Sequence, residues 1–137
     1  MNMQKLIQTS GKVFTGFSIL SIGYVSIFSL ISPQGTMDLV QTTLPNTDAI
    51  SSIRGIYGGV GMAVSISLIY LMLKENGKAL IFLSLFWGAY AFSRVLTIMI
   101  DGELGAFGTQ WLMIEGVLCL IGLLLTWVNQ REKVAFL

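Results

Sequence analysis

The feature that most constrains this chain is the run from Ala79 to Ile100, which is apolar almost throughout and contains one arginine, Arg94. About 20 consecutive apolar residues are needed for a helix to cross the hydrocarbon core of a bilayer. The run therefore predicts a membrane-spanning helix. Because lipid accommodates a charge inside such a helix only at a large cost in free energy, we expect Arg94 to have a partner elsewhere in the chain.

The composition agrees with a membrane protein and argues against several kinds of chemistry. Of the 137 residues, 54% are hydrophobic and 11% are charged, whereas about 25% of the residues in soluble domains are charged. The eight basic and seven acidic residues nearly balance, which argues against a nucleic-acid partner. The chain has no histidine and one cysteine, Cys119, so Cys/His metal sites and histidine-based catalysis are excluded. We expect no cofactor and no enzymatic activity.

Four apolar segments are long enough to cross a membrane: residues 13–31, 54–73, 79–100 and 111–128. They predict an all-α fold, an integral membrane four-helix bundle with up-down-up-down order, in a single transmembrane domain that covers residues 1–137. The first segment exceeds a typical signal-peptide apolar region and lacks a small-x-small cleavage pattern, so we expect it to be a retained span.

The loop after the first span contains two local signals. Residues 36–44 are expected to form a short interfacial helix. Asp48 is expected to be the N-cap of a helix that runs from Ala49 to Leu73. The short polar turn at residues 74–78 predicts that the second and third spans are antiparallel neighbours.

The distribution of basic residues predicts the orientation of the chain. With four spans, the N-terminus, the 74–78 turn and the C-terminus share one side of the membrane. Most of the basic residues lie on that side: Lys5, Lys12, Lys74, Lys78, Arg131 and Lys133. Because short cytoplasmic segments are enriched in lysine and arginine, we expect both termini in the cytoplasm.

Ionisable residues gather in the half of the bundle that this orientation places outside. Tyr90, Arg94 and Asp101 share one face of the third span, together with Trp87 and Thr97. In the fourth span, Glu115 begins a small or polar stripe that continues through Cys119, Gly122 and Thr126. Arg54 lies near the outer end of the second span. The candidate ligand-binding residues are Arg54, Tyr57, Tyr90, Arg94, Asp101 and Glu115.

Three interpretations of these residues remain open. Arg94 and Glu115 form a buried structural ion pair in the first. In the second, two arginines offer forked donors to a carboxylate or phosphate in an outward-facing pocket. The third is proton or ion coupling through Glu115. The first two are compatible, because a pair can also line a pocket.

Small residues recur every fourth position in the second span, at Gly55, Gly59, Ala63 and Ser67. Gly58 and Gly61 widen this small surface. Such a surface allows two helices to approach closely. Packing within the monomer is the favoured interpretation, and the seam of a homodimer is the alternative.

The segment Arg54-Gly55-Ile56-Tyr57-Gly58-Gly59, followed by Arg94, Asp101-Gly102 and Glu115, resembles a family of small bacterial four-span membrane proteins, domain of unknown function 4345. The resemblance extends from the first span to the fourth. It implies a bacterial inner-membrane protein and the same polar positions, and it supplies no activity, substrate or cofactor.

The expected function is binding of a small anionic or amphiphilic ligand, such as a lipid headgroup, or a role as an accessory membrane subunit. The expected partners are membrane lipid, such a ligand, and a second copy or a membrane-complex subunit. The alternative is a small oligomeric transporter in which Glu115 exchanges a proton for substrate, although nearby arginines would make this exchange harder.

The orientation is tested by introducing single cysteines and labelling them from each side of the membrane. Residues 5, 76 and 133 should react from the cytoplasmic side, and residues 40 and 105 from the outside. Labelling of residue 76 from the outside would overturn the orientation.

Overall fold

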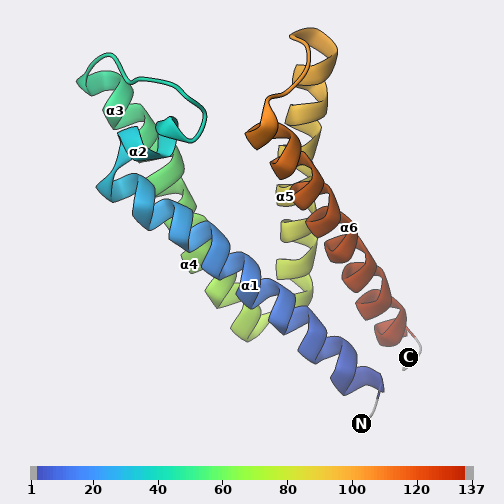
Figure 1. The fold of residues 1–137 in the computed structure, drawn as a ribbon. Coiled ribbons are helices and arrows are strands. Elements are labelled where there is room, and N and C mark those ends of the chain that lie inside the picture. Colours follow the sequence, from blue (N-terminus) through green and yellow to red (C-terminus); the bar gives the residue numbers. More distant parts are fainter. Residues whose placement is uncertain (1–2, 135–137) are drawn as a thin grey trace. The chain divides into compact units, whose positions relative to one another are not determined.

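The computed structural model describes residues 3–134, with side chains for residues 4–131, so the side chain of Lys133 lies outside the described part. The described residues are almost entirely helical and contain no strand, which confirms the predicted all-α class. The helices are shown in Figure 1. In order they are α1 (Met3–Ile31), α2 (Pro33–Asp38), α3 (Thr47–Ile53), the π-helix η1 (Arg54–Val60), α4 (Gly61–Lys74), α5 (Asn76–Ile100) and α6 (Ala106–Val134).

Four helical segments are long and apolar enough to cross a membrane: Gln4–Ile31, Thr47–Lys74, Asn76–Ile100 and Ala106–Arg131. Each contains one of the four predicted apolar segments. The side chains are arranged as in a membrane protein, since Leu20, Ile31 and Met99 are all more than 70% exposed. By contrast, Ser18 and Ser26 are at most 1% exposed. Small polar residues at helix contacts and large apolar residues outside are typical of helices packed in lipid.

The chain consists of two compact units, one formed by Met1–Thr15 with Met72–Leu137 and the other by Gly16–Leu71. Helix α1 contributes its first turns to one unit and its remaining turns to the other.

In the Gly16–Leu71 unit, α1 closely approaches η1 at Gly58 and α4 at Gly61. A Cβ atom at Gly61 would overlap the hydroxyl of Ser26, and one at Gly58 would lie 2.7 Å from Leu30 Cγ. The Ser26 hydroxyl donates to the carbonyl of Ile22 at 2.7 Å, so this buried polar group is satisfied within its own helix. The two backbones can be this close only because Gly58 and Gly61 lack side chains.

The predicted packing surface of the second span is correct at Gly58 and Gly61, but for the Gly16–Leu71 unit it is wrong at the stripe of Gly55, Gly59, Ala63 and Ser67. All four residues are exposed, and a Cβ at Gly55 or Gly59 would meet no atom within 4 Å. The face that packs on α1 contains Gly58, Gly61 and Ser65, which lie beside Leu30, Ser26 and Gly23 respectively.

The loop helices begin at residues other than those predicted. Helix α2 starts at Pro33, earlier than the expected segment 36–44, because the Ser32 side chain accepts from the N–H of Gly35 and Pro33 suits the first helical position. Helix α3 is capped by Asn46 rather than Asp48, and its side chain accepts from Ala49 N–H at 2.8 Å. Asp48 lies in the first turn, where a carboxylate interacts favourably with the helix dipole.

The predicted continuous helix from Ala49 to Leu73 is interrupted by the π-helix η1 over Arg54–Val60. This segment has the sequence RGIYGGV and contains three glycines. Wide π turns of this kind are rare and are frequently found at functional sites.

In the other unit, α5 and α6 form an antiparallel hairpin joined by residues 101–105. The N–H groups of Asp101 and Gly102 both donate to the carbonyl of Thr97, at 2.8 and 3.2 Å. Gly102 has φ of +108°, a conformation that a side chain would strain, and it ends α5. The start of α1 joins this unit through Thr15, whose hydroxyl donates to Asn76 Oδ1 at 3.0 Å.

Two glycine substitutions in one helical span test the packing face. We expect Gly61→Leu to lower the melting temperature of the purified protein in detergent, since overpacking costs about 1–3 kcal/mol and this site has no free volume. Gly59→Leu is the matched control, and its added side chain enters open space. A larger loss for Gly59→Leu than for Gly61→Leu would contradict the observed face.

Candidate functional site

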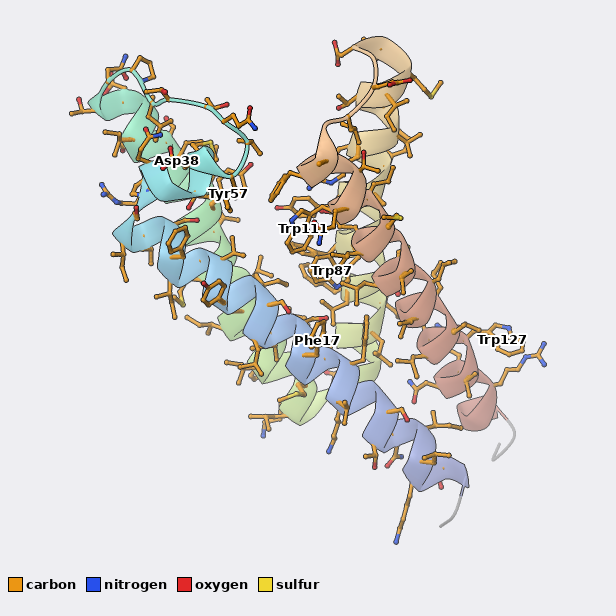
Figure 2. All side chains as sticks on the ribbon, in the orientation of Figure 1. Phe17, Asp38, Tyr57, Trp87, Trp111 and Trp127 are labelled. Atoms are coloured by element: carbon orange, nitrogen blue, oxygen red, sulfur yellow. The ribbon has the colours of Figure 1, made fainter. Side chains whose placement is uncertain are left out.

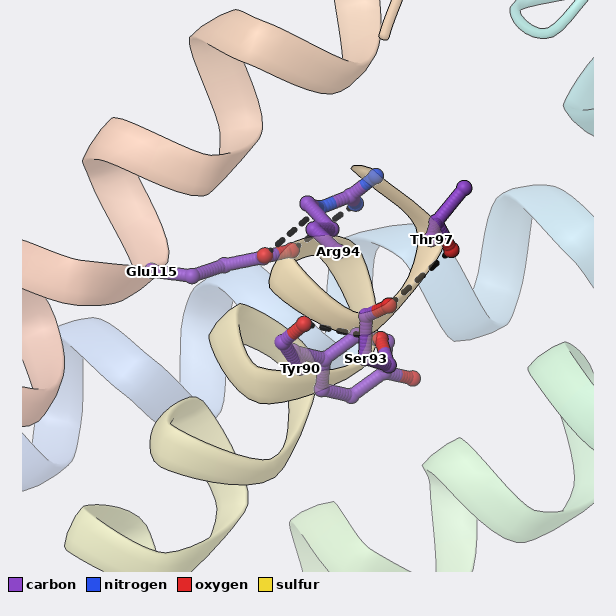
Figure 3. A network of polar contacts seen from close by, with 5 residues as sticks. All are labelled: Tyr90, Ser93, Arg94, Thr97 and Glu115. Atoms are coloured by element: carbon purple, nitrogen blue, oxygen red, sulfur yellow. Dashed lines mark hydrogen bonds and ion pairs between the residues drawn. The ribbon is translucent and has the colours of Figure 1, made fainter. Parts of the chain in front are cut away.

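The predicted partner of Arg94 is present, because Arg94 on α5 and Glu115 on α6 form a two-bond ion pair (Figure 3). Arg94 Nε donates to Glu115 Oε2 at 2.6 Å, and Arg94 Nη2 donates to Oε1 at 2.9 Å. The Glu115 side chain is 3% exposed and that of Arg94 is 21% exposed. A planar guanidinium facing both carboxylate oxygens is the strongest common form of ion pair.

Close contact between α5 and α6 brings the two charged side chains within reach of each other. A Cβ atom at Gly122 would lie 2.7 Å from the hydroxyl of Ser84 and 3.3 Å from its Cα. A Cβ at Gly88 would lie 3.1 Å from Cys119 Sγ. Gly122 and Gly88 therefore let the helices approach to nearly backbone contact, as small residues do in membranes.

Two charged side chains inside membrane spans must be paired, but the pair need not make the protein more stable than apolar residues would. Removing one partner of a buried pair typically costs about 3–5 kcal/mol, whereas replacing both with apolar residues is often neutral. A single arginine at the centre of a span costs at least about 2.5 kcal/mol on insertion scales. Glu115 therefore makes Arg94 tolerable in α5, and Arg94 does the same for Glu115 in α6.

The polar groups around Arg94 on α5 bond mainly along their own helix. The Ser93 hydroxyl donates to the carbonyl of Tyr90 at 2.8 Å, and the Thr97 hydroxyl donates to the carbonyl of Ser93 at 3.0 Å (Figure 3). The Tyr90 ring lies 5.1 Å from that of Phe86 and is 40% exposed. Tyr90 and Arg94 thus follow one another on one face of α5, as predicted.

Asp101, the other predicted carboxylate, lies at the end of α5 and is exposed. Its backbone N–H contributes to the C-cap of α5. The two-bond pair with Arg94 is therefore made by Glu115 of the opposite helix, as one of the interpretations of the sequence predicted.

Arg54 and Tyr57 belong to the Gly16–Leu71 unit, where both lie in the π-helix η1. Arg54 Nε donates to the carbonyl of Leu30 at 2.9 Å. Leu30 is in the last turn of α1, whose final carbonyls have no partner within the helix, so Arg54 caps that helix end. The convergence of Arg54 and Tyr57 with Arg94 stays a prediction.

The predicted stripe on the fourth span faces α5 at three of its four positions. Glu115 pairs with Arg94, Cys119 Sγ donates to the carbonyl of Ser84 at 3.4 Å, and Gly122 contacts Ser84. Thr126 ends the stripe, and its hydroxyl is buried without a hydrogen-bond partner among the described residues. Cys119 is a free thiol, and the described residues bring together no group of three His, Cys, Asp or Glu side chains that could hold a metal.

Sequence reasoning missed the buried polar face of α1. Thr15, Ser18, Ser26 and Ser29 are at most 1% exposed, and with Gly11 they recur at helical spacing. A periodicity search restricted to small and hydroxyl residues would have found this face, because these side chains allow close packing in membranes.

The second missed feature is at the end of α6. Trp127 lies in the last turns of α6, and its ring projects away from the helix (Figure 2). The Arg131 guanidinium carbon lies 4.0 Å from the centre of this ring, a cation–π contact that the sequence did not suggest.

Comparison with known proteins identifies a family without a known activity. No curated protein and no solved structure matches the chain. Residues 10–127 match the model of the Domain of unknown function (DUF4345). The matched region includes Arg94 and Asp101 at α5 and Glu115 on α6. The match covers most of the sequence, and the chain therefore belongs to the DUF4345 family.

Proposed function

We propose that this protein is a multi-pass membrane protein that binds a small anionic or amphiphilic ligand at Arg94 and does not catalyse a reaction. The observation that carries the proposal is the unequal burial of the ion pair. Glu115 is almost completely buried, whereas 21% of the Arg94 side chain remains exposed within a membrane span. A guanidinium is the cation best suited to a carboxylate or phosphate ligand.

The ion pair prepares Arg94 for binding by fixing its orientation. An arginine side chain carries about 2 kcal/mol of rotamer entropy that is lost when it is immobilised. Two hydrogen bonds to Glu115 already hold the guanidinium plane, so most of this loss occurs on folding rather than on binding.

The neighbouring ring of Tyr90 supports an amphiphilic ligand. Tyr90 lies one turn before Arg94 on the same face of α5 and is 40% exposed. An exposed aromatic ring next to a guanidinium suits a ligand with an anionic head and an apolar chain.

Binding accounts for the geometry better than proton exchange does. Both carboxylate oxygens of Glu115 accept hydrogen bonds from Arg94. A transport cycle that protonates Glu115 would have to break this two-bond pair and leave Arg94 uncompensated in the span. The same membrane site would also suit an accessory subunit that meets an acidic group of a partner.

The proposal places the protein in a bacterial inner membrane with both termini in the cytoplasm. The lysine distribution supports this orientation. The exposed edge of Arg94 then lies in the outer half of the membrane and is reached by ligands from outside.

The binding proposal is tested with dodecanoate, and with dodecanol as the uncharged probe of the same chain length, on protein purified in a neutral maltoside detergent. We expect dodecanoate to raise the melting temperature and dodecanol to have little effect. The double substitution of Arg94→Leu with Glu115→Leu should leave the protein folded and weaken dodecanoate binding at least about tenfold, since a hydrogen bond to a charged group contributes about 1.5–3 kcal/mol.

The control is Lys5→Gln, which removes an exposed charge at the start of α1. It should bind dodecanoate like the wild type. Equal effects of dodecanoate and dodecanol, or unchanged dodecanoate binding by the double variant, would refute the proposal.

A further inference from the structure

A cavity of about 400 Å³ lies in the unit formed by the start of α1 and by residues from Met72 onwards. Its walls come from the first turns of α1, the turn between α4 and α5, and the last turns of α6. Its volume falls within the range of about 300–1,000 Å³ found for small-molecule sites. The sequence analysis used these residues only to orient the chain, and their meeting around one space is a separate observation.

Positive charge dominates this cavity. Three lysines, Lys12, Lys74 and Lys78, line it together with a single carboxylate, that of Glu75. Lys78 pairs with Glu75 at 2.5 Å. Among the described residues, Lys12 and Lys74 make no ion pair, so the cavity holds two uncompensated positive charges contributed by two helices.

The cavity also offers neutral hydrogen-bond donors. The side-chain oxygen of Asn76 accepts from the Thr15 hydroxyl at 3.0 Å, which leaves the Asn76 amide nitrogen as a donor. Asn129 and Gln130 contribute further amides from α6. Helix α5 begins here, and its N-cap residue Glu75 makes no side-chain capping bond, so the positive end of the helix dipole adds to the same field.

Apolar side chains complete the wall beside these polar groups. Leu80 and Ile81 of α5 line the cavity, and Ile81 is 42% exposed. A ligand that carries its anionic group on an apolar body would contact both kinds of surface. Basic pockets between membrane helices at their cytoplasmic ends are suited to anionic phospholipid headgroups.

We propose that this cavity binds a phosphate group, supplied by the headgroup of an anionic phospholipid, between Lys12 and Lys74. Its location at the ends of membrane-crossing helices and its apolar wall favour the lipid over a soluble phosphate. The site is separate from the one at Arg94, and it gives the protein a preference for anionic lipid at the opposite ends of α5 and α6.

The test uses full-length protein in neutral maltoside detergent and three probes: dihexanoyl phosphatidylglycerol, dihexanoyl phosphatidylcholine and inorganic phosphate. We expect phosphatidylglycerol to bind measurably more tightly than phosphatidylcholine. The double substitution of Lys12→Gln with Lys74→Gln should weaken phosphatidylglycerol binding about 25-fold, at roughly fivefold for each lysine. It leaves the Lys78–Glu75 pair in place.

The matched control is Lys5→Gln with Arg131→Gln. It also removes two positive charges, one from α1 and one from α6, and neither residue lines the cavity. This control should change phosphatidylglycerol binding by less than about threefold. The proposal would be overturned if Lys12→Gln with Lys74→Gln lost less than tenfold in phosphatidylglycerol affinity, or if the control lost as much. Equal binding of the two lipids would also overturn it. If the double variant does not fold, Lys12→Gln alone should lose about fivefold, and an unchanged affinity would overturn it.

Competition identifies the source of the phosphate. Weak displacement of phosphatidylglycerol by inorganic phosphate supports the phospholipid, and displacement at similar concentrations supports the phosphate site but assigns it to a soluble ligand. The double substitution of Arg94→Leu with Glu115→Leu should bind phosphatidylglycerol like the wild type. This result separates the present proposal from the one at Arg94.

Discussion

The ion pair between Arg94 and Glu115 is the interaction on which the α5–α6 hairpin depends. Either charge alone in hydrocarbon would destabilise its helix, and together they form a neutral fork with two short hydrogen bonds. The fork forms only if the two helices are close and in one register. Gly88 and Gly122 permit that closeness, and the pair selects the register, which small residues alone do not specify.

The same kind of contact recurs in the Gly16–Leu71 unit without a charged pair. There, Gly58 and Gly61 meet α1 at Leu30 and Ser26. The serines on the contact faces donate to carbonyls of the preceding turn, as Ser26 does to Ile22 and Ser84 does to Leu80. Such bonds satisfy buried hydroxyls within one helix, so the helices can pack through polar side chains while large apolar ones face lipid.

The sequence was sufficient to predict features that depend on the length of apolar segments and on the cost of placing a charge in the membrane. Four long apolar segments predicted four candidate spans, and the cost of an isolated Arg94 predicted a carboxylate partner, which is Glu115. For the small surface of the second span, the prediction was right at Gly58 and Gly61 and wrong at the stripe on which it was centred. Gly55 and Gly59 are as small as Gly58 and Gly61, so composition shows that close approach is possible but not which face makes it.

Two other features could not be predicted from the periodicity of the sequence. A π-helix over Arg54–Val60 widens the helical turn, so a face counted at 3.6 residues per turn shifts position within this segment. The cavity beside Lys12, Lys74 and Lys78 is lined by residues from three separate parts of the chain, namely the start of α1, the 74–78 turn and the end of α6. Charge counting assigned these segments to one side of the membrane, but only the folded chain shows that they line one open pocket.

The measurement that tests the central role of the ion pair most directly is a double-mutant cycle on unfolding in mixed micelles. The cycle compares the wild type, Arg94→Leu, Glu115→Leu and the double variant. Each single substitution should lower the free energy of unfolding by about 3–5 kcal/mol, the loss typical of breaking a buried pair, and the double variant should be more stable than either single variant. A double variant whose loss equals the sum of the two single losses would contradict the account.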